Sequence, residues 1–418
     1  MRTEHRPWHT WIEPWYLVYA LMGLVVAGLI PVLIPLIVSQ SGNAGQVGLV
    51  MAGISLGGLS SPLWGKLADR YRTHRWLLAG GMLFASIGLA SFALTTQTVI
   101  LIFLAVILGL GTASAATVAY LFVVEAHPKV EWDDRIGWLQ TFYGMGQVSG
   151  LLLAGLLTRT DFRSGLLVAA GLSVVAAILG WFTSKTPTVQ PGLEPVLIHS
   201  ARHTEGVFSS PQRLFHRPKL LGIKIRKSLL RSPFGLFLLI WLMAFTGPAA
   251  LFSQYPILMQ KLYGVTPVNS SIAFAIIAGL GLTLYTPAGR WSEHYGAARI
   301  LRISLGLRLF AFAAMLWLVL MPASGIAGLL ALLAFGFVVW AWSLMNVSGT
   351  ALAARLSPVG EGEGMGIFNA TTAIAGVIGA VLGGWAAVVW GYSSIVTLAL
   401  LGVTLSLGLS FLVNKKEL

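Results

Sequence analysis

The sequence predicts an all-α polytopic membrane protein with twelve transmembrane helices, arranged as two pseudo-symmetric bundles of six. Three observations predict this fold: an apolar composition, twelve apolar runs of near-spanning length, and basic residues gathered almost entirely on one side. The chain has 418 residues, of which 56% are hydrophobic and 10% charged, and its mean hydropathy is +0.81. Soluble domains carry about 25% charged residues, so this chain needs lipid as part of its solvent.

The apolar runs define the predicted helices. A helix needs about 20 apolar residues to cross the hydrocarbon core of a bilayer, and backbone groups cannot remain unpaired there. The first run is longer than the apolar part of a cleavable signal peptide, about 7–15 residues, so we expect a retained helix. The predicted spans are residues 15–38, 45–65, 76–95, 98–123, 136–157, 164–183, 233–254, 268–290, 299–321, 324–346, 363–389 and 393–413.

A polar stretch separates the sixth run from the seventh. It divides the chain into an N-terminal bundle (1–183), a basic linker (184–232) and a C-terminal bundle (233–418). Bulky apolar residues alternate with basic residues from Arg213 to Lys227. Such a segment is typical of a positive tether at the membrane surface, and its alternative is an interfacial helix that binds anionic lipid heads.

The basic residues predict the orientation. With twelve spans, 24 of the 27 lysines and arginines fall on the side of the chain ends, and Arg159, Arg163 and Lys261 fall on the other. Lysine and arginine are enriched in cytoplasmic loops. We therefore expect both termini and the linker to be cytoplasmic, in an inner or plasma membrane. The net charge of +13 is then a topology signal, and we expect no nucleic-acid partner.

Two segments of the sequence repeat at a fixed offset. Residues 65–75 contain a glycine, an acid, a tyrosine and a terminal arginine, and residues 289–299 contain the same types 224 positions later. A glycine pair in the fifth span, at residues 150 and 155, recurs in the eleventh span at an offset of 229. Duplication of a membrane bundle is a common plan of secondary transporters, which bind substrate between the repeats.

The loop at residues 65–75 resembles the hallmark of the major facilitator superfamily, Gly-x-x-x-Asp-Arg, often preceded by proline. Pro62, Gly65, Asp69 and Arg70 match it, and Arg72 stands where that family has glycine. The resemblance implies transport by alternating access, with a central cavity between the bundles. It also implies a latch that holds the cytoplasmic side closed. The latch residues that it implies are Gly65, Asp69, Arg70, Arg75, Glu293 and Arg299.

No pattern of catalytic residues is present in the sequence. Lys66 is followed by leucine rather than the serine or threonine of a phosphate-binding loop. The chain has no cysteine and therefore no thiolate ligand or nucleophile. We expect no enzymatic activity, no cofactor and no metal site.

Ionisable residues inside spans are the usual sign of ion coupling, but here the acids fall near predicted helix ends. If protons couple transport, the candidate carboxylates are Glu13, Glu125, Asp133 and Asp134. Arg308 is the deepest basic residue. The resemblance implies a peripheral position for its helix, so we expect its side chain to reach the cytoplasmic interface rather than bind an anionic substrate.

Neutral polar and aromatic residues are the remaining candidates for a substrate site. Gln140 and Gln147 are seven residues apart and share a helix face with Tyr143. Such groups suit a neutral, amphipathic or aromatic substrate, although they also serve as hydrogen bonds between membrane helices. The predicted cavity residues are Gln140, Tyr143, Gln147, Gln254, Tyr255, Trp340, Asn346 and Asn369.

Together these features predict a monomeric secondary transporter of a small molecule. We expect efflux of a hydrophobic or amphipathic compound, with proton antiport as its coupling. One alternative is uptake or facilitated diffusion of a neutral metabolite such as a sugar or nucleoside. Others are a lipid-handling flippase and a membrane scaffold that transports nothing.

Overall fold

The computed structural model describes residues 12–127, 132–159, 161–184, 232–321, 325–358 and 361–412. For residues 66, 69, 70, 124–126, 132–134 and 361–363 within these ranges it describes the backbone alone. All regular structure in the described ranges is helical. The predicted all-α fold class is therefore confirmed for the chain as described.

The first half of the chain forms six helical spans. The first span is composed of three consecutive helices, because a π-helical segment lies in its middle: Ile30 donates its N–H to the carbonyl of Val25, and Pro31 beyond it has no N–H to donate. The helices of this half are α1 (Tyr16–Met22), η2 (Gly23–Leu29), α2 (Ile30–Ser41), α3 (Ala44–Gly58), α4 (Ser61–Tyr71), α5 (His74–Leu94), α6 (Thr98–Ala126), α7 (Trp132–Leu157) and α8 (Phe162–Thr183).

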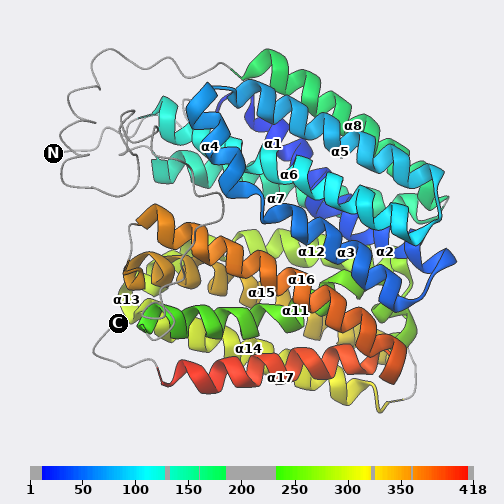
Figure 1. Cartoon of the computed structure of the whole chain (residues 1–418). Helices are drawn as coiled ribbons and strands as arrows, with labels where there is room; N and C mark the ends of the chain where they lie inside the picture. The colour runs from blue at the N-terminus through cyan, green and yellow to red at the C-terminus, as the bar shows by residue number, and fades with distance from the viewer. Residues whose placement is uncertain are drawn as a thin grey trace.

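The second half repeats this arrangement. Two of its helices, α11 and α15, extend well beyond the predicted ends at 254 and 346. The helices are α11 (Pro233–Tyr263), α12 (Pro267–Leu282), α13 (Tyr285–Tyr295), α14 (Ala297–Leu318), α15 (Gly325–Leu356), α16 (Glu361–Trp390) and α17 (Ser393–Ser410). Figure 1 shows α1–α8 gathered in one group and α11–α17 in the other.

The described helices are consistent with the prediction of twelve spans. Ten of them are long and apolar enough to cross a membrane, and α12 with α13, a pair bent by 47°, makes eleven if counted as one span. The remaining helix, α7, has 26 residues and lies between η2 and α12. It is not among the ten because Gln140, Tyr143 and Gln147 make its sequence more polar.

The second span of each half breaks at the same place in the repeat. α3 gives way to α4 at Leu59–Ser60, and α12 gives way to α13 at Thr283–Leu284, 224 residues later. Both short helices then end on a residue with positive φ, Arg72 at +50° and Gly296 at +88°. The two halves therefore correspond in the conformation of individual backbone positions as well as in sequence.

The two halves touch mainly on one side of the molecule. We call the side on which α1 begins the basic side, because Arg72, Arg75 and Arg299 lie there. On the opposite side α3 packs on α16, α7 packs on α12, and Gln254 donates a hydrogen bond of 2.8 Å to the carbonyl of Ala44. On the basic side α4 packs on α5 and α6 of its own half, and α13 packs on α14 and α15 of its own half. The described helices are thus closed together on the opposite side and part towards the basic side.

Candidate functional site

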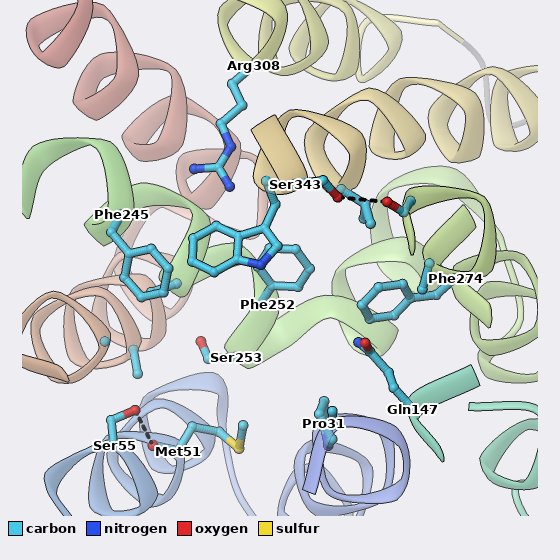
Figure 2. A pocket seen from close by; sticks show the side chains of 18 of the residues that line it. Pro31, Met51, Ser55, Gln147, Phe245, Phe252, Ser253, Phe274, Arg308 and Ser343 are labelled. Atoms are coloured by element: carbon cyan, nitrogen blue, oxygen red, sulfur yellow. Dashed lines mark hydrogen bonds between the residues drawn. The ribbon is translucent and has the colours of Figure 1, made fainter. Parts of the chain in front are cut away.

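A cavity of about 370 Å³ lies between the two halves, near the middle of the helices that line it. Pro31 and Gln147 reach it from the first half, and Phe245, Phe252 and Arg308 reach it from the second (Figure 2). Its lining residues are Ala27, Pro31, Met51, Ser55, Gln147, Phe245, Ala249, Phe252, Ser253, Phe274, Ala278, Gly281, Leu282, Tyr285, Arg308, Val339, Trp342, Ser343, Gly376 and Ala380.

Aromatic rings form much of the cavity wall. Phe252 and Phe274 lie with centroids 5.9 Å apart, and Phe245 lies 5.3 Å from Trp342. These spacings fall within the range of favourable ring contacts, about 4.5–7 Å. The rings hold one another in place and present a preformed apolar surface to a ligand.

Most polar groups of the wall are already hydrogen-bonded. The hydroxyls of Ser55, Ser253 and Ser343 donate to the backbone carbonyls of Met51, Ala250 and Gly281, at 3.3, 2.8 and 3.0 Å. Gln147 makes no hydrogen bond to the residues that the structure describes. Its amide is therefore available to a ligand, whereas the donor hydrogens of these serines are occupied.

Arg308 corrects one expectation from the sequence. Its side chain does not reach the basic-side interface but is fully buried and turned towards the cavity (Figure 2). Its Nη1 donates at 3.3 Å to the carbonyl of Ala244, with Met345 Sδ also at 3.3 Å, and the guanidinium lies 5.6 Å from the Trp342 ring centroid. The interface expectation failed because the Arg308 side chain is directed to α11 and α15, where Nη1 meets the Ala244 carbonyl and Met345.

The Arg308 guanidinium has unused donors. Its Nε and Nη2 are buried and have no hydrogen-bond partner, and no ion pair to it occurs among the described residues. An uncompensated buried charge costs several kcal/mol in a protein interior. An intramembrane ionisable group of this kind therefore points to a functional role.

Three predicted cavity residues lie on the approach to the cavity from the basic side. Gln140 precedes Gln147 by two helical turns on the same face of α7 and bonds the hydroxyl of Tyr120. Asn346 follows Trp342 by one turn on α15, and Asn369 precedes Gly376 by two turns on α16. Gln140 and Asn369 are exposed. Helical spacing therefore places these amides between the cavity and the basic-side ends of α7, α15 and α16.

The other predicted cavity residues make contacts between helices. Gln254 joins α11 to α3, Tyr255 donates from its hydroxyl to the carbonyl of Ser270 at 3.0 Å, and Trp340 donates to the carbonyl of Ile277 at 3.1 Å. The Tyr143 ring lies 5.0 Å from that of Tyr19. None of the four lines the cavity.

The implied latch is described in part. Gly65 lies on α4, where an added methyl group would meet Thr117 at an ordinary distance of 3.8 Å. The Arg75 guanidinium lies 4.1 Å from the ring centroid of Trp181, and Glu293 and Arg299 are exposed. The side chains of Asp69 and Arg70 lie outside the described residues, so the latch remains a prediction.

Glu13 is the described member of the candidate coupling carboxylates. It lies 2.6 Å from His127 Nε2 and 3.0 Å from Arg135 Nη1, and Trp15 Nε1 donates to it at 2.8 Å. This cluster ties the residues just before α1 to the end of α6, at His127, and to the first turn of α7, at Arg135. The side chains of Glu125, Asp133 and Asp134 lie outside the described residues. Among the residues that are described, no group of histidines and acids is placed to hold a metal ion.

Two groups of membrane helices around a central cavity define a secondary membrane transporter. The chain belongs to the Major Facilitator Superfamily, whose sequence profile matches residues 15–346. It is a transporter and not an enzyme, and its fold is that of a multi-pass inner-membrane protein.

Similar proteins include multidrug transporters. The multidrug resistance protein MdtH of Aeromonas salmonicida is 28% identical over 378 residues, which cover 86% of this chain and 84% of that protein. MdtH of Photorhabdus laumondii is 27% identical and covers 77% of this chain and 72% of its own length.

Among solved structures, the nucleoside transporter NupG, as its D323A mutant, matches with a TM-score of 0.74 at 14% identity, over 96% of this chain and 98% of its own. A D-xylose–proton symporter matches with a TM-score of 0.68 at 14% identity, over 94% and 96%. At these identities the likeness shows the fold alone.

Proposed function

We propose that this transporter exports a hydrophobic or amphipathic small molecule across the inner membrane by alternating access. The observation that carries the proposal is the cavity wall, in which aromatic and aliphatic side chains surround few polar groups. Pockets of about 300–1,000 Å³ with such a lining suit drug-sized ligands. The similarity to proteins named for multidrug resistance supports the same direction of transport.

The polar groups of the cavity favour this substrate class over a sugar or nucleoside. A polyhydroxylated ligand loses hydrogen bonds to water on entering a site and needs partners there to replace them. Ser55, Ser253 and Ser343 donate to backbone carbonyls, so few of the polar side chains that line the cavity, among them Gln147 and Arg308, have donors free for a ligand. Such a wall stabilises an apolar ligand better than it stabilises a ligand that carries several hydroxyl groups.

The basic side is proposed to face the cytoplasm. The support is the predicted distribution of lysine and arginine, of which 23 of 27 fall on that side once Arg308 is assigned to the cavity. In this orientation the described structure opens inward, and a substrate enters past Gln140, Asn346 and Asn369. An impermeant maleimide applied to intact cells should label a cysteine placed at Asn269 and spare one placed at Tyr295. The reverse pattern would invert the assignment.

A neutral aromatic dye, N-phenyl-1-naphthylamine, tests export. Cells that overproduce the chain should retain less dye than cells that overproduce Gln147→Ala, because this substitution removes a free amide from the cavity. One neutral hydrogen bond is worth about 0.5–1.5 kcal/mol, so the initial efflux rate should fall about 2- to 10-fold. Ser149→Ala is the matched control, since Ser149 is exposed, lies outside the cavity lining and bonds its own helix.

The result also separates the parts of the proposal. Equal retention by wild type, by Gln147→Ala and by cells without the chain would contradict export of this class. If a pH gradient left the efflux rate from proteoliposomes unchanged, the export proposal would still hold, but proton antiport would be contradicted.

The latch implied by the loop at residues 65–75 is proposed to hold the basic side closed during part of the cycle. Asp69 lies at the end of α4, on the helix that parts from the other half in the described structure. Asp69→Asn should reduce turnover while leaving expression near that of wild type, because it removes charge without changing shape. Undiminished turnover would refute the latch.

A further inference from the structure

The buried guanidinium of Arg308 is the unexplained polar group of the cavity. It lies near the middle of α14, at 0% exposure. Its neighbours from the elements packed against it are neutral: the Ala244 carbonyl from α11, and Met345 and the Trp342 ring from α15. No acidic side chain of the described residues reaches it.

The structure leaves Arg308 with the geometry of a binding group. The buried Nε and Nη2 atoms are adjacent donors without a partner, and together they form an edge of the guanidinium fork. Such an edge matches the two oxygens of a carboxylate or a similar planar anion. Arg308 lines the cavity, but these two atoms are covered in the described structure, so a ligand pairs with this edge once the side chains that cover it move.

We propose that the transported substrate is an amphipathic organic anion, whose apolar body lies against the aromatic wall and whose carboxylate-type group pairs with Arg308. This inference rests on the proposed function and names the substrate class of the same cavity. The rings of Phe252, Phe274 and Trp342 supply the apolar contact. Arg308 supplies the only formal charge among the residues that line the described cavity.

The proposal predicts that cationic compounds are not preferred substrates. A cationic compound in the cavity would meet a buried like charge with no intervening carboxylate, which disfavours binding. A neutral compound of the same shape would occupy the apolar wall but leave the Arg308 donors unpaired. Affinity should therefore rank anion above neutral compound above cation for one apolar scaffold.

Calorimetry on the full chain in nanodiscs tests this ranking, with empty nanodiscs as the blank. The probes are 2-naphthylacetate and 2-(2-naphthyl)ethanol, which share a ring system and differ in charge. Wild type should bind the carboxylate at least about 10-fold more tightly than the alcohol, since hydrogen bonds between charged groups are the strong ones. Arg308→Gln should lose about that factor for the carboxylate and stay within about twofold for the alcohol.

Arg302→Gln is the matched control. Arg302 lies on the same helix but donates from Nε and Nη2 to the carbonyl of Ser410, at 3.3 and 2.9 Å, and is not part of the cavity lining. Its carboxylate preference should equal that of wild type. Should Arg308→Gln fail to fold, Arg308→Lys keeps the positive charge and should retain a reduced preference for the anion.

The outcomes distinguish this inference from the function on which it rests. Equal affinity of wild type for the two compounds would overturn the anion site. If Trp342→Ala then weakened the binding of both compounds, the proposed apolar export cavity would still be supported. Binding of neither compound by wild type would overturn the anion site and contradict the proposed export cavity as well.

Discussion

Arg72 occupies a backbone position that favours glycine. It ends α4 with φ of +50°, and the equivalent residue of the second half, Gly296, ends α13 with φ of +88°. A side chain in this left-handed region crowds its own backbone and costs about 1–2 kcal/mol. The N-terminal loop therefore carries a local strain that the C-terminal loop does not.

Arg72→Gly should stabilise the protein, because glycine adopts this conformation freely. The expected gain is about 1 kcal/mol, read as a higher melting temperature of the purified protein in detergent. Arg72→Ala is the control, since it removes the guanidinium but keeps a Cβ at positive φ. If alanine stabilised as much as glycine, the gain would come from loss of charge rather than from relief of the backbone.

The residues of the site were only partly predictable from the sequence. Gln147 was predicted because it shares a helix face with Gln140 and Tyr143 in an otherwise apolar run, and it lines the cavity. Phe252 and Phe274 were missed as wall residues, because apolar side chains in an apolar helix give no signal of which face they occupy. Arg308 was noticed, but its direction depends on packing between α11, α14 and α15, which sequence spacing does not reveal.

At the scale of helices, glycines set how closely the first and fifth spans of each half approach. A methyl group on Gly150 would overlap the carbonyl oxygen of Leu24 in η2, and one on Gly379 would overlap that of Thr246 in α11. These glycines are 229 residues apart and make equivalent contacts in the two halves. Small residues at such crossings let membrane helices pack backbone to backbone.

Gly150→Ala should therefore destabilise the N-terminal half. Overpacking of a well-packed site costs about 1–3 kcal/mol, so the melting temperature should fall and the yield of monodisperse protein should drop. Gly171→Ala on α8 is the matched control, because nothing lies within 4 Å of the added methyl group. Equal stability of the two variants would show that the α7–η2 contact can relax without cost.

Helix positions were largely predictable, because each span must satisfy its own backbone in lipid. The extra lengths of α11 and α15 were not, since the predicted apolar runs ended at residues 254 and 346, whereas both positions lie within continuous helices. The breaks before α4 and α13 were also missed. They occur at Leu59–Ser60 and Thr283–Leu284, just before Pro62 and Pro287, which have no backbone N–H with which to continue the preceding helix.

At the scale of the whole molecule, the two halves meet on the opposite side and part on the basic side. The contacts that close the opposite side are backbone approaches at small residues, such as Gly48 of α3 against Ala380 and Gly384 of α16. Such contacts can separate without breaking ion pairs. The central cavity would then open to the other side, as alternating access requires.

Pulsed electron–electron distance measurements between pairs of spin labels test this account most directly. The chain has no cysteine, so spin labels can be attached to introduced cysteines alone. One pair replaces Tyr71 and Tyr295 on the basic side, and the other replaces Gln97 and Asn269 on the opposite side. All four residues are exposed. The account predicts that, when substrate is added, the basic-side distance shortens while the opposite-side distance lengthens. Distances that stay fixed, or that change in the same direction on both sides, would contradict it.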